Sequence, residues 1–524
     1  MTSRIFGLIL AAFAWGSLAY AGAADGVFNR ANGNEPDTLD PQKYELISEN
    51  NILRDLFEGL TTQDENNHVV PGQAESWTIS NDGLVWTFKL REGLKWSDGA
   101  PLSAEDFVLG ARRLADPKTA AKIPDGVFKL ANGRDIVEGR KPPEELGIAA
   151  PDARTVVVTL AVRSPIIPIT MWQTTFVPVP HHIYAQFGED WVKPEHIVTN
   201  GAYTLVSWDP SDHVTVRKNP YFRAADTVAI ETVNFYPSDD NEMALKRFRA
   251  GEIDFVPQLP PSKIDWAKAT VPEALQMTPV MQFRYLAMNQ ARDAFKDKRV
   301  RRALALLVDR ETIANSLMHG AALPAYGIVP RALENYAGAE LDFKAMAKPQ
   351  RIAEAKRLLA EMGYGPSSPL SFEFRTMSDA WAKPVATAIL AMWKSAGINV
   401  TLKSAEGRSH FAALTAGDYD VALSGWQGTD DPEEFMWLFQ AGGGINDSKY
   451  ANPAFDDARR DAEQTMDMAA RYARYADAEK ILLDDVATIP VFWTVIPVLV
   501  SPEVHGFKAT PTGLTRSRYA TFGR

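Results

Sequence analysis

The stretch best suited to chemistry is a loop that carries four carboxylates behind a single tryptophan. In SGWQGTDDPEEF, residues 424–435, Trp426 precedes Asp430, Asp431, Glu433 and Glu434. An aromatic ring and a carboxylate at the end of a strand can together hold an apolar group and an ammonium group. Composition alone also allows a solvated acidic loop. A calcium site is disfavoured because the run lacks the alternating Asp-x-Asp-x-Asn-Gly pattern that wraps one ion.

Patterns for catalysis are weak in the rest of the chain. The sequence has no Gly-x-Ser-x-Gly elbow, no HExxH, no GxxxxGK and no cysteine to act as a thiol nucleophile. His181 and His182 lack carboxylate or thiol ligands at metal spacing, which favours a structural or surface role. Adjacent acids such as Asp239 and Asp240 could serve a hydrolase, but neighbours on a strand point to opposite sides. We therefore expect no enzyme, no metal site and no cofactor.

The elements around the acidic loop follow an α/β pattern. DYDVAL, residues 418–423, is an apolar strand that leads directly into the loop. Upstream, SFEFRT predicts a strand, KPVATAILAMWKSAG a helix and INVTLKS a second strand, which is the order of a βαβ crossover. The run VATIPVFWTVIPVLV, residues 486–500, predicts a buried strand near the C-terminus. Short strands at 84–90, 154–160, 213–219 and 227–237 predominate earlier in the chain.

The N-terminus indicates export. One positive charge at Arg4, an apolar run and the small-x-small sequences at 19–23 are typical of a secretory signal peptide, which we place at residues 1–23. Without cysteine, the mature protein has no disulfide and no N-terminal lipid anchor, so we expect it free in a periplasm. The net charge of -11 argues against a nucleic-acid partner.

Four long stretches resemble the extracellular solute-binding proteins, family 5, that serve peptide ABC importers, most closely the oligopeptide-binding subgroup. The longest is AESWTISNDGLVWTFKLREGLKWSDGAPLSAEDF at 74–107; the others are LDPQKYELISENNILRDLFEGL, IVTNGAYTL and MNQARDAFKDKRVRRALALLVDRETI. The resemblance implies a three-domain α/β clamp with two hinged lobes and an extra small domain. Carried onto this chain, lobe I takes 24–58, 182–284 and 497–524, the extra domain takes 59–181, and lobe II takes 285–496.

The resemblance also implies how a ligand is held. An extended peptide adds its backbone to strand edges of both lobes, and an acid pairs with its N-terminal ammonium. Glu45, Leu46 and Ile47 match the contacting loop of lobe I, while Gly425, Trp426 and Gln427 match the strand edge of lobe II. Plain packing remains an alternative for Ile47 and Gly425. The family's aspartate position falls on Thr429, but this loop is one residue shorter, which favours Asp430 as the anchor. Asp431, Glu433 and Glu434 are then expected in a solvated loop and helix start.

Other positions depart from the family pattern. Where relatives place a second tryptophan and cations for the far end of the peptide, this chain has Gly407, Leu414 and Leu423. Trp381 replaces another polar contact, and Arg408 is the nearest substitute cation. These departures suggest a short, capped or modified ligand.

The resemblance thus predicts a monomeric periplasmic component that delivers a peptide or peptide-like solute to an inner-membrane ABC permease. Two alternatives stay open. The same clamp could bind a non-peptide solute such as an opine, a sugar oligomer or another small organic compound. It could also act in chemosensing, with a membrane receptor in place of the permease. Ligand identity, ligand length and the partner permease are not determined by the sequence.

Overall fold

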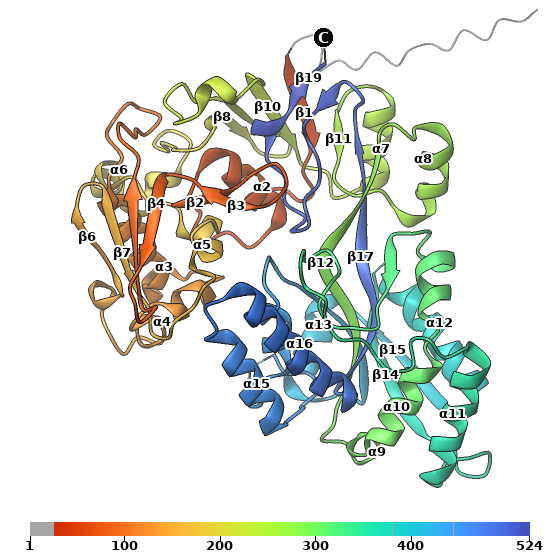
Figure 1. The fold of residues 1–524 in the computed structure, drawn as a ribbon. Helices are drawn as coiled ribbons and strands as arrows, with labels where there is room; N and C mark the ends of the chain where they lie inside the picture. Colours follow the sequence, from red (N-terminus) through yellow and green to blue (C-terminus); the bar gives the residue numbers. More distant parts are fainter. Residues whose placement is uncertain (1–25, 380, 444, 524) are drawn as a thin grey trace, which may run out of the picture.

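The computed structural model describes residues 26–379, 381–443 and 445–523, and the predicted signal peptide, 1–23, lies outside them. Figure 1 shows two α/β halves, one above the other, with a third region beside the upper half. The third region contains residues 59–181, coloured orange to yellow. In the described residues no helix has the length and apolar character needed to cross a membrane.

One mixed sheet of eleven strands extends through both halves. Its lower part has the order β15 (Asn399–Ala405), β14 (Ser371–Met377), β16 (Val421–Gln427), β12 (Leu275–Met288) and β17 (Thr488–Val500). The upper part continues through β11 (Phe255–Val256), β1 (Val27–Ala31), β10 (Thr232–Tyr236), β9 (His213–Lys218) and β8 (Tyr203–Asp209). The short β13 (Ala322–Pro324) pairs with β17.

Strands β12 and β17 are the long antiparallel pair that joins the halves (Figure 1). Their pairing is regular from Leu275 to Pro279 and resumes at Phe283, with an irregular stretch between. A break in a ladder leaves backbone groups unpaired and lets the strands bend locally. The two halves are therefore connected through a locally weakened ladder.

The lower half confirms the predicted βαβ unit. β14 and β15 are parallel, and α12 (Ala382–Ser395) connects them. The other helices here are α9 (Asp293–Lys296), α10 (Lys298–Leu307), α11 (Lys348–Glu361), α13 (Gly407–Ala416), α14 (Glu433–Met436), α15 (Pro453–Glu463) and α16 (Met468–Asp484). Gly363 follows α11 with a φ of 80°, the left-handed conformation that favours glycine after a helix.

The third region is built on a four-stranded sheet of order β4 (Ala74–Ile79), β5 (Val85–Leu90), β7 (Thr155–Thr159) and β6 (Ile148–Asp152). In β5 the alternation of Trp86, Phe88 and Leu90 with polar residues buries one face, as its period of two requires. Beside it lie the hairpin β2 (Thr61–Gln63) and β3 (Val69–Pro71), and the helices α3 (Ala104–Ala115), α4 (Gly133–Val137), α5 (Ile167–Thr170) and α6 (His181–Phe187).

The upper half adds α2 (Ile47–Leu56), α7 (Asn241–Arg249) and α8 (Ile264–Thr270). The strand predicted at 227–237 begins only at Thr232, because residues 225–227 form a 3-10 turn. Buried side chains of the third region and of the upper half around α2 and β8–β10 form one continuous core. The lower half has a second core that also includes side chains of α7 and α8.

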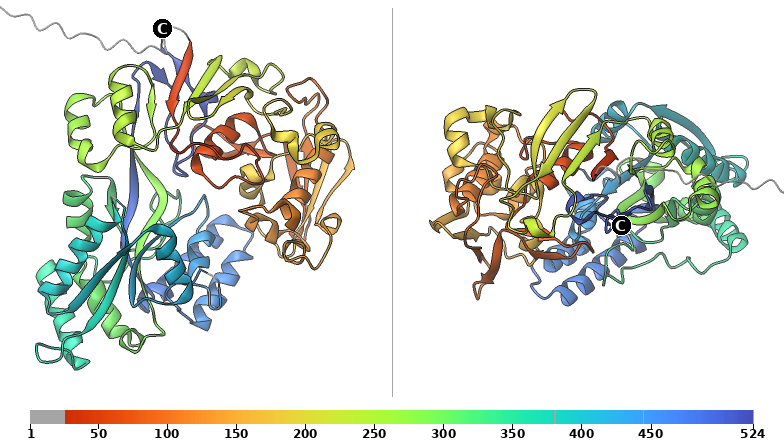
Figure 2. Two further views of the ribbon diagram at one scale, coloured as in Figure 1. Left: turned by 180° about the vertical axis from the view of Figure 1, so that it is seen from behind. Right: turned by 90° about the horizontal axis from the view of Figure 1, so that it is seen from above.

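Figure 1 and the rear view in Figure 2 both place α15 and α16 beside the third region. The lower half therefore approaches the third region as well as the upper half to which the sheet connects it.

Candidate functional site

An unpaired strand edge lies where the resemblance places the ligand. Along one side, β16 pairs with β12 from Val421 to Gln427. Along the other side, in the described chain, β14 pairs with β16 only at Val421 and Ala422. The backbone of Gly425, Trp426 and Gln427 on that side has no strand neighbour, so it can accept an added strand.

The side chains of this edge occupy different surroundings. The Trp426 ring is partly buried, with its centroid 6.1 Å from that of Trp437, and its Nε1 has no hydrogen-bond partner among the described residues. Gln427 is exposed and its Nε2 donates to the carbonyl oxygen of Thr512 at 3.0 Å. Thr512 belongs to the C-terminal segment of the upper half, so Gln427 connects the two halves.

The structure separates the two candidates for the ammonium anchor. The backbone N–H and the hydroxyl of Thr429 both donate to the Glu434 carboxylate, at 2.7 and 2.5 Å. Asp430 instead points across to the β2–β3 hairpin, where its two oxygens accept from Gln63 and Asn67, each at 2.9 Å. The Thr429 side chain is therefore bonded within its own loop, whereas the Asp430 carboxylate lies at the boundary between the halves.

Burial raises the pKa of Asp430 to about 6, even though the hydrogen bond from Asn67, the charge of Arg54 and the bond from Gln63 lower it. Arg54 also contacts Asp430 indirectly, through Gln63. Its guanidinium donates to Oε1 of Gln63 at 2.6 Å. Asp430 is therefore a partly buried carboxylate for which any additional cation is a favourable neighbour.

The expectation of a solvated loop for the remaining acids is wrong. Asp431 is fully buried and paired with Arg471 of α16, with an Oδ1–Nη2 distance of 2.9 Å. Glu433 binds the same arginine at 2.6 Å and Lys129 of the third region at 2.5 Å. Burial opposes ionisation of Glu433, but Lys129 and Arg471 together lower its pKa. The cations come from distant parts of the chain, so the local sequence could not reveal them.

Glu434 is partly buried. Burial raises its pKa to about 7, against the stabilising bonds from Thr429. The adjacent acids Asp430 and Asp431 point to different partners, in agreement with the argument that neighbouring carboxylates do not share one substrate.

The predicted loop of the first lobe forms the beginning of α2. The backbone N–H groups of Glu45 and Leu46 both donate to Oε2 of Glu49 at 2.8 Å, which fixes the turn. Glu45 is exposed, and the Ile47 side chain is 52% exposed despite being apolar. In the described chain no hydrogen bond joins these three residues to β16. An exposed isoleucine on a fixed turn is suited to contact with an apolar group.

Arg408 lies apart from the strand edge. It is exposed at the start of α13, its backbone N–H donates to Glu406 at 3.0 Å, and its side chain has no ion pair among the described residues. It follows β15, which β14 separates from β16 in the sheet order. Leu414 and Leu423 are buried in the lower core, so these positions of the family pattern serve packing in this chain.

Sequence reasoning missed a cation at the strand edge. Arg284 of β12 pairs directly with Gly425. A Cβ added at Gly425 would lie 2.1 Å from Nη1 of Arg284, so the guanidinium occupies the space above this glycine. The available signal was an arginine inside the otherwise apolar strand MQFRYLAM.

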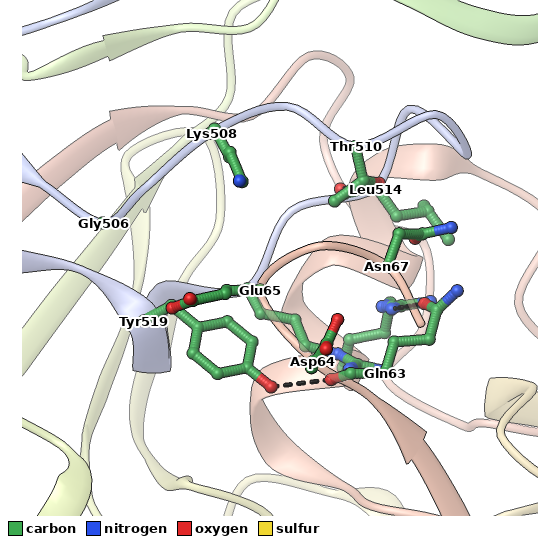
Figure 3. A pocket seen from close by; sticks show the side chains of 11 residues that line it. Gln63, Asp64, Glu65, Asn67, Gly506, Lys508, Thr510, Leu514 and Tyr519 are labelled. Atoms are coloured by element: carbon green, nitrogen blue, oxygen red, sulfur yellow. Dashed lines mark hydrogen bonds between the residues drawn. The ribbon is translucent and has the colours of Figure 1, made fainter. Parts of the chain in front are cut away.

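A small cavity lies beside the β2–β3 hairpin, the element to which Asp430 is hydrogen-bonded (Figure 3). Its volume of about 20 Å³ holds roughly one water molecule, so it is too small for a peptide. Arg54, Gln63 and Asn67 line it together with the C-terminal segment, and the hydroxyl of Tyr519 donates to the Gln63 carbonyl oxygen at 2.6 Å. This cavity belongs to the support of the hairpin. The described residues include no group of three or more His, Cys, Asp or Glu that could hold a metal ion.

Comparison with known proteins shows the family of the chain. The model for bacterial extracellular solute-binding proteins, family 5 Middle, matches residues 68–447. The chain is 36% identical to the probable deoxycholate-binding periplasmic protein YgiS of Escherichia coli over 92% of this chain and 90% of that protein. It is also 36% identical to the periplasmic oligopeptide-binding protein OppA of Salmonella typhimurium, over 91% of this chain and 89% of that protein.

Solved structures show the same fold. The unliganded open form of the murein tripeptide-binding protein MppA superposes with a TM-score of 0.84 at 30% identity, covering 95% of this chain and 97% of that one. OppA of Haemophilus influenzae in complex with the peptide RPPGFSPFR superposes with a TM-score of 0.79 at 32% identity, covering 95% of this chain and 99% of that one.

Proposed function

Because the chain belongs to the bacterial extracellular solute-binding proteins, family 5, we propose that it captures a peptide or peptide-like solute in a periplasm for an ABC importer. Its two α/β lobes close over the solute and deliver it to an inner-membrane permease. The relatives OppA and MppA are named as periplasmic peptide-binding proteins, which supports this assignment. The protein works as a monomer and without catalytic turnover.

The observation that carries the proposal is the open edge of β16 beside Asp430. Strand addition uses only the ligand backbone, so the edge at Gly425, Trp426 and Gln427 accepts peptides of varied sequence. The partly buried Trp426 ring supplies an apolar wall. Glu45, Leu46 and Ile47 contribute contacts from the other lobe.

Asp430 is the anchor for the ligand ammonium in this proposal. A carboxylate has about four lone-pair sites, so the two bonds from Gln63 and Asn67 leave acceptor capacity for an ammonium. Thr429 is the weaker candidate, because Glu434 already accepts from both its N–H and its hydroxyl.

Closure occurs at the irregular part of the β12–β17 ladder. In this assignment lobe I takes residues 24–58, 182–284 and 497–524, the extra domain 59–181 and lobe II 285–496. The irregular stretch between Pro279 and Phe283 lies close to residue 284, where the chain passes from lobe I into lobe II. Bending there would concentrate the change of backbone angles in a few residues, as hinge motions generally do.

A second candidate ligand class is a non-peptide carboxylate such as a bile acid. YgiS, at 36% identity, is named a probable deoxycholate-binding protein. The buried Leu414 and Leu423, at positions where the family pattern has polar or aromatic ligand contacts, also favour a ligand with fewer polar groups. The clamp and its closure are the same in both cases.

Mass spectrometry of ligand released from the purified protein by mild denaturation tests the proposal. We expect the released compound to be a peptide or peptide derivative. Isothermal titration should show that this compound binds again to the ligand-free protein. Recovery of a bile acid would select the second candidate. If neither co-purified compounds nor short peptides and deoxycholate bind, the proposed function is wrong. Loss of solute uptake in a deletion strain would separate transport from chemosensing.

A further inference from the structure

The side chain of Arg284 extends from β12 over Gly425 of β16. Cross-strand partners in an antiparallel pair project to the same face, so Arg284 and Gly425 share a face of the sheet. Nη1, Cδ and Cζ of Arg284 lie 2.1, 2.8 and 3.0 Å from the position that a Cβ of residue 425 would take. Only glycine leaves room for the side chain to lie flat over β16. The guanidinium thereby lies over Gly425, a residue of β16 that pairs with β12 but has no β14 partner in the described chain.

An aromatic residue holds the guanidinium in this position. Cζ of Arg284 lies 4.2 Å from the ring centroid of Trp381, which follows β14. The Trp381 ring contacts Phe492 of β17 edge to face, with centroids 6.0 Å apart, and Phe492 pairs with Arg284 in the ladder. Stacking fixes the plane of a guanidinium while leaving its edge N–H groups free to donate.

No anion neutralises this cation in the described chain. Arg284 has no ion pair within residues 26–379, 381–443 and 445–523, and no hydrogen bond from its side chain is found there. Asp379 is the carboxylate that acts on it electrostatically, but its Oδ1 accepts from the backbone N–H of Ala382 at 2.7 Å, at the start of α12. Burial lowers the pKa of Arg284 to about 10, so the group is still cationic at neutral pH. A largely desolvated charge without a counterion is costly, and a bound anion removes much of that cost.

We propose that Arg284 binds an anionic group of the solute, a carboxylate, which it reaches across Gly425. This inference rests on the proposed function and specifies the chemistry of its ligand. The carboxylate could be the C-terminus of a peptide or the acid group of a non-peptide solute, and the guanidinium would recognise both through paired N–H donors.

The position of Arg284 also limits the length of a peptide ligand. Asp430 lies five residues after Gly425 in the chain, and five extended residues span at most about 17 Å. A peptide held by its ammonium at Asp430 and by its carboxylate at Arg284 therefore has about two to five residues. The departures at Leu414 and Leu423 agree with a binding site that ends early.

Titration of the mature protein with matched acids and amides tests the proposal. The probes are alanine peptides of two to five residues, their C-terminal amides, deoxycholate and its neutral carboxamide. We expect wild type to prefer one acid over its amide by about tenfold or more, because bonds to charged groups are the strong ones. Arg284→Gln should remove that preference: the affinity for the acid should fall, and the affinity for the amide should stay within threefold of the wild-type value. Gly425→Ala, which displaces the guanidinium, should act in the same direction.

Arg299→Gln is the charge control. Arg299 is exposed on α10 and bonded to Asp297, so its loss removes one positive charge from the same lobe without touching β16. Thermal unfolding of each variant verifies folding. If wild type binds acid and amide equally, or if Arg284→Gln weakens both alike, Arg284 is not the anion site although the proposed function stands. If wild type binds none of the probes, the ligand classes of the proposed function fail and this inference fails with them.

Discussion

At the scale of single residues, the site depends on carboxylates whose neighbours differ sharply. Asp430 and Asp431 are adjacent in sequence, yet one faces the amides of Gln63 and Asn67 and the other is buried against Arg471. In the proposed function the first carboxylate binds the ligand, whereas the second forms the buried ion pair with Arg471.

The first residue-scale prediction concerns the anchor. Asp430→Asn should weaken binding of trialanine by at least about tenfold, because a charge-assisted bond to the ammonium is lost. Thr429→Ala should have a smaller effect, since Thr429 bonds to Glu434. Isothermal titration at neutral pH measures both. Equal affinity of wild type and Asp430→Asn would contradict the assignment, and the reverse ranking would move the anchor to Thr429.

The raised pKa of Asp430 predicts a pH dependence. With a folded-state pKa of about 6, Asp430 is about nine-tenths ionised at pH 7 and one-tenth ionised at pH 5. Affinity for an ammonium-bearing peptide should therefore fall by about tenfold between pH 7 and pH 5. Asp430→Asn should lack this part of the pH dependence. Glu434 is a nearby carboxylate with a pKa of about 7, and the difference between wild type and Asp430→Asn removes its contribution.

The same shift has an opposite consequence for stability. In the unfolded chain Asp430 has its ordinary pKa of 3.8. Between pH 3.8 and about pH 6 the folded protein therefore holds the Asp430 proton more tightly than the unfolded chain does. The contribution of Asp430 to the free energy of unfolding is then largest at low pH and decreases as the pH rises through 6. Ligand affinity and this part of stability change in opposite directions with pH.

At the scale of elements, buried ion pairs fasten the loop after β16 to its neighbours. Arg471 connects α16 to Asp431 and to Glu433 at the start of α14, and Lys129 connects Glu433 to the third region. The loop that presents Asp430 is thus held from behind by α16 and from the side by the extra domain.

Removing Arg471 should therefore be strongly destabilising. Arg471→Met leaves Asp431 buried without its cation, which we expect to lower the free energy of unfolding by about 3–5 kcal/mol in urea titrations. Arg460→Met is the matched control, because Arg460 and Asp457 form an exposed pair on the neighbouring α15 and should contribute less than about 1 kcal/mol. A similar small effect for both variants would show that Asp431 tolerates the loss of its partner.

Elements with a local signal were predictable from the sequence. The crossover of β14, α12 and β15, the end of α11 at Gly363 and the long apolar β17 all follow from periodicity and capping residues. The side-chain partners of the site were not. Gln63 lies 367 residues from Asp430, and the role of Gly425 depends on Arg284 in another strand. Contacts set by tertiary packing leave no trace in the spacing of residues along the chain.

At the scale of the whole molecule, the two halves share one sheet but present different parts of the site. In the proposed closure, β16 would move with the lower half, whereas α2 and the β2–β3 hairpin would move with the upper half and the third region. The contacts of Asp430 with Gln63 and Asn67, of Gln427 with Thr512 and of Glu433 with Lys129 all cross this boundary. The proposed ligand binding and lobe closure would therefore involve the same few residues.

Closure predicts a change in overall dimensions. Addition of a saturating peptide should lower the radius of gyration of the mature protein in small-angle scattering, because the ligand favours the closed population. At the same peptide concentration, Asp430→Asn should show a smaller decrease. An unchanged radius with full occupancy by titration would contradict a hinged clamp.

The hairpin opposite Asp430 has a practical use. Glu65 is exposed in the turn of the hairpin, close to the contact of Asn67 with Asp430, and the chain has no cysteine. A cysteine substituted at Glu65 would be the single thiol in the protein, so one fluorescent dye could be attached there without any further engineering. In the proposed clamp the turn and the loop after β16 lie on opposite sides of the hinge. The emission of that dye would then follow solute concentration, and the molecule would become an optical sensor for its own ligand.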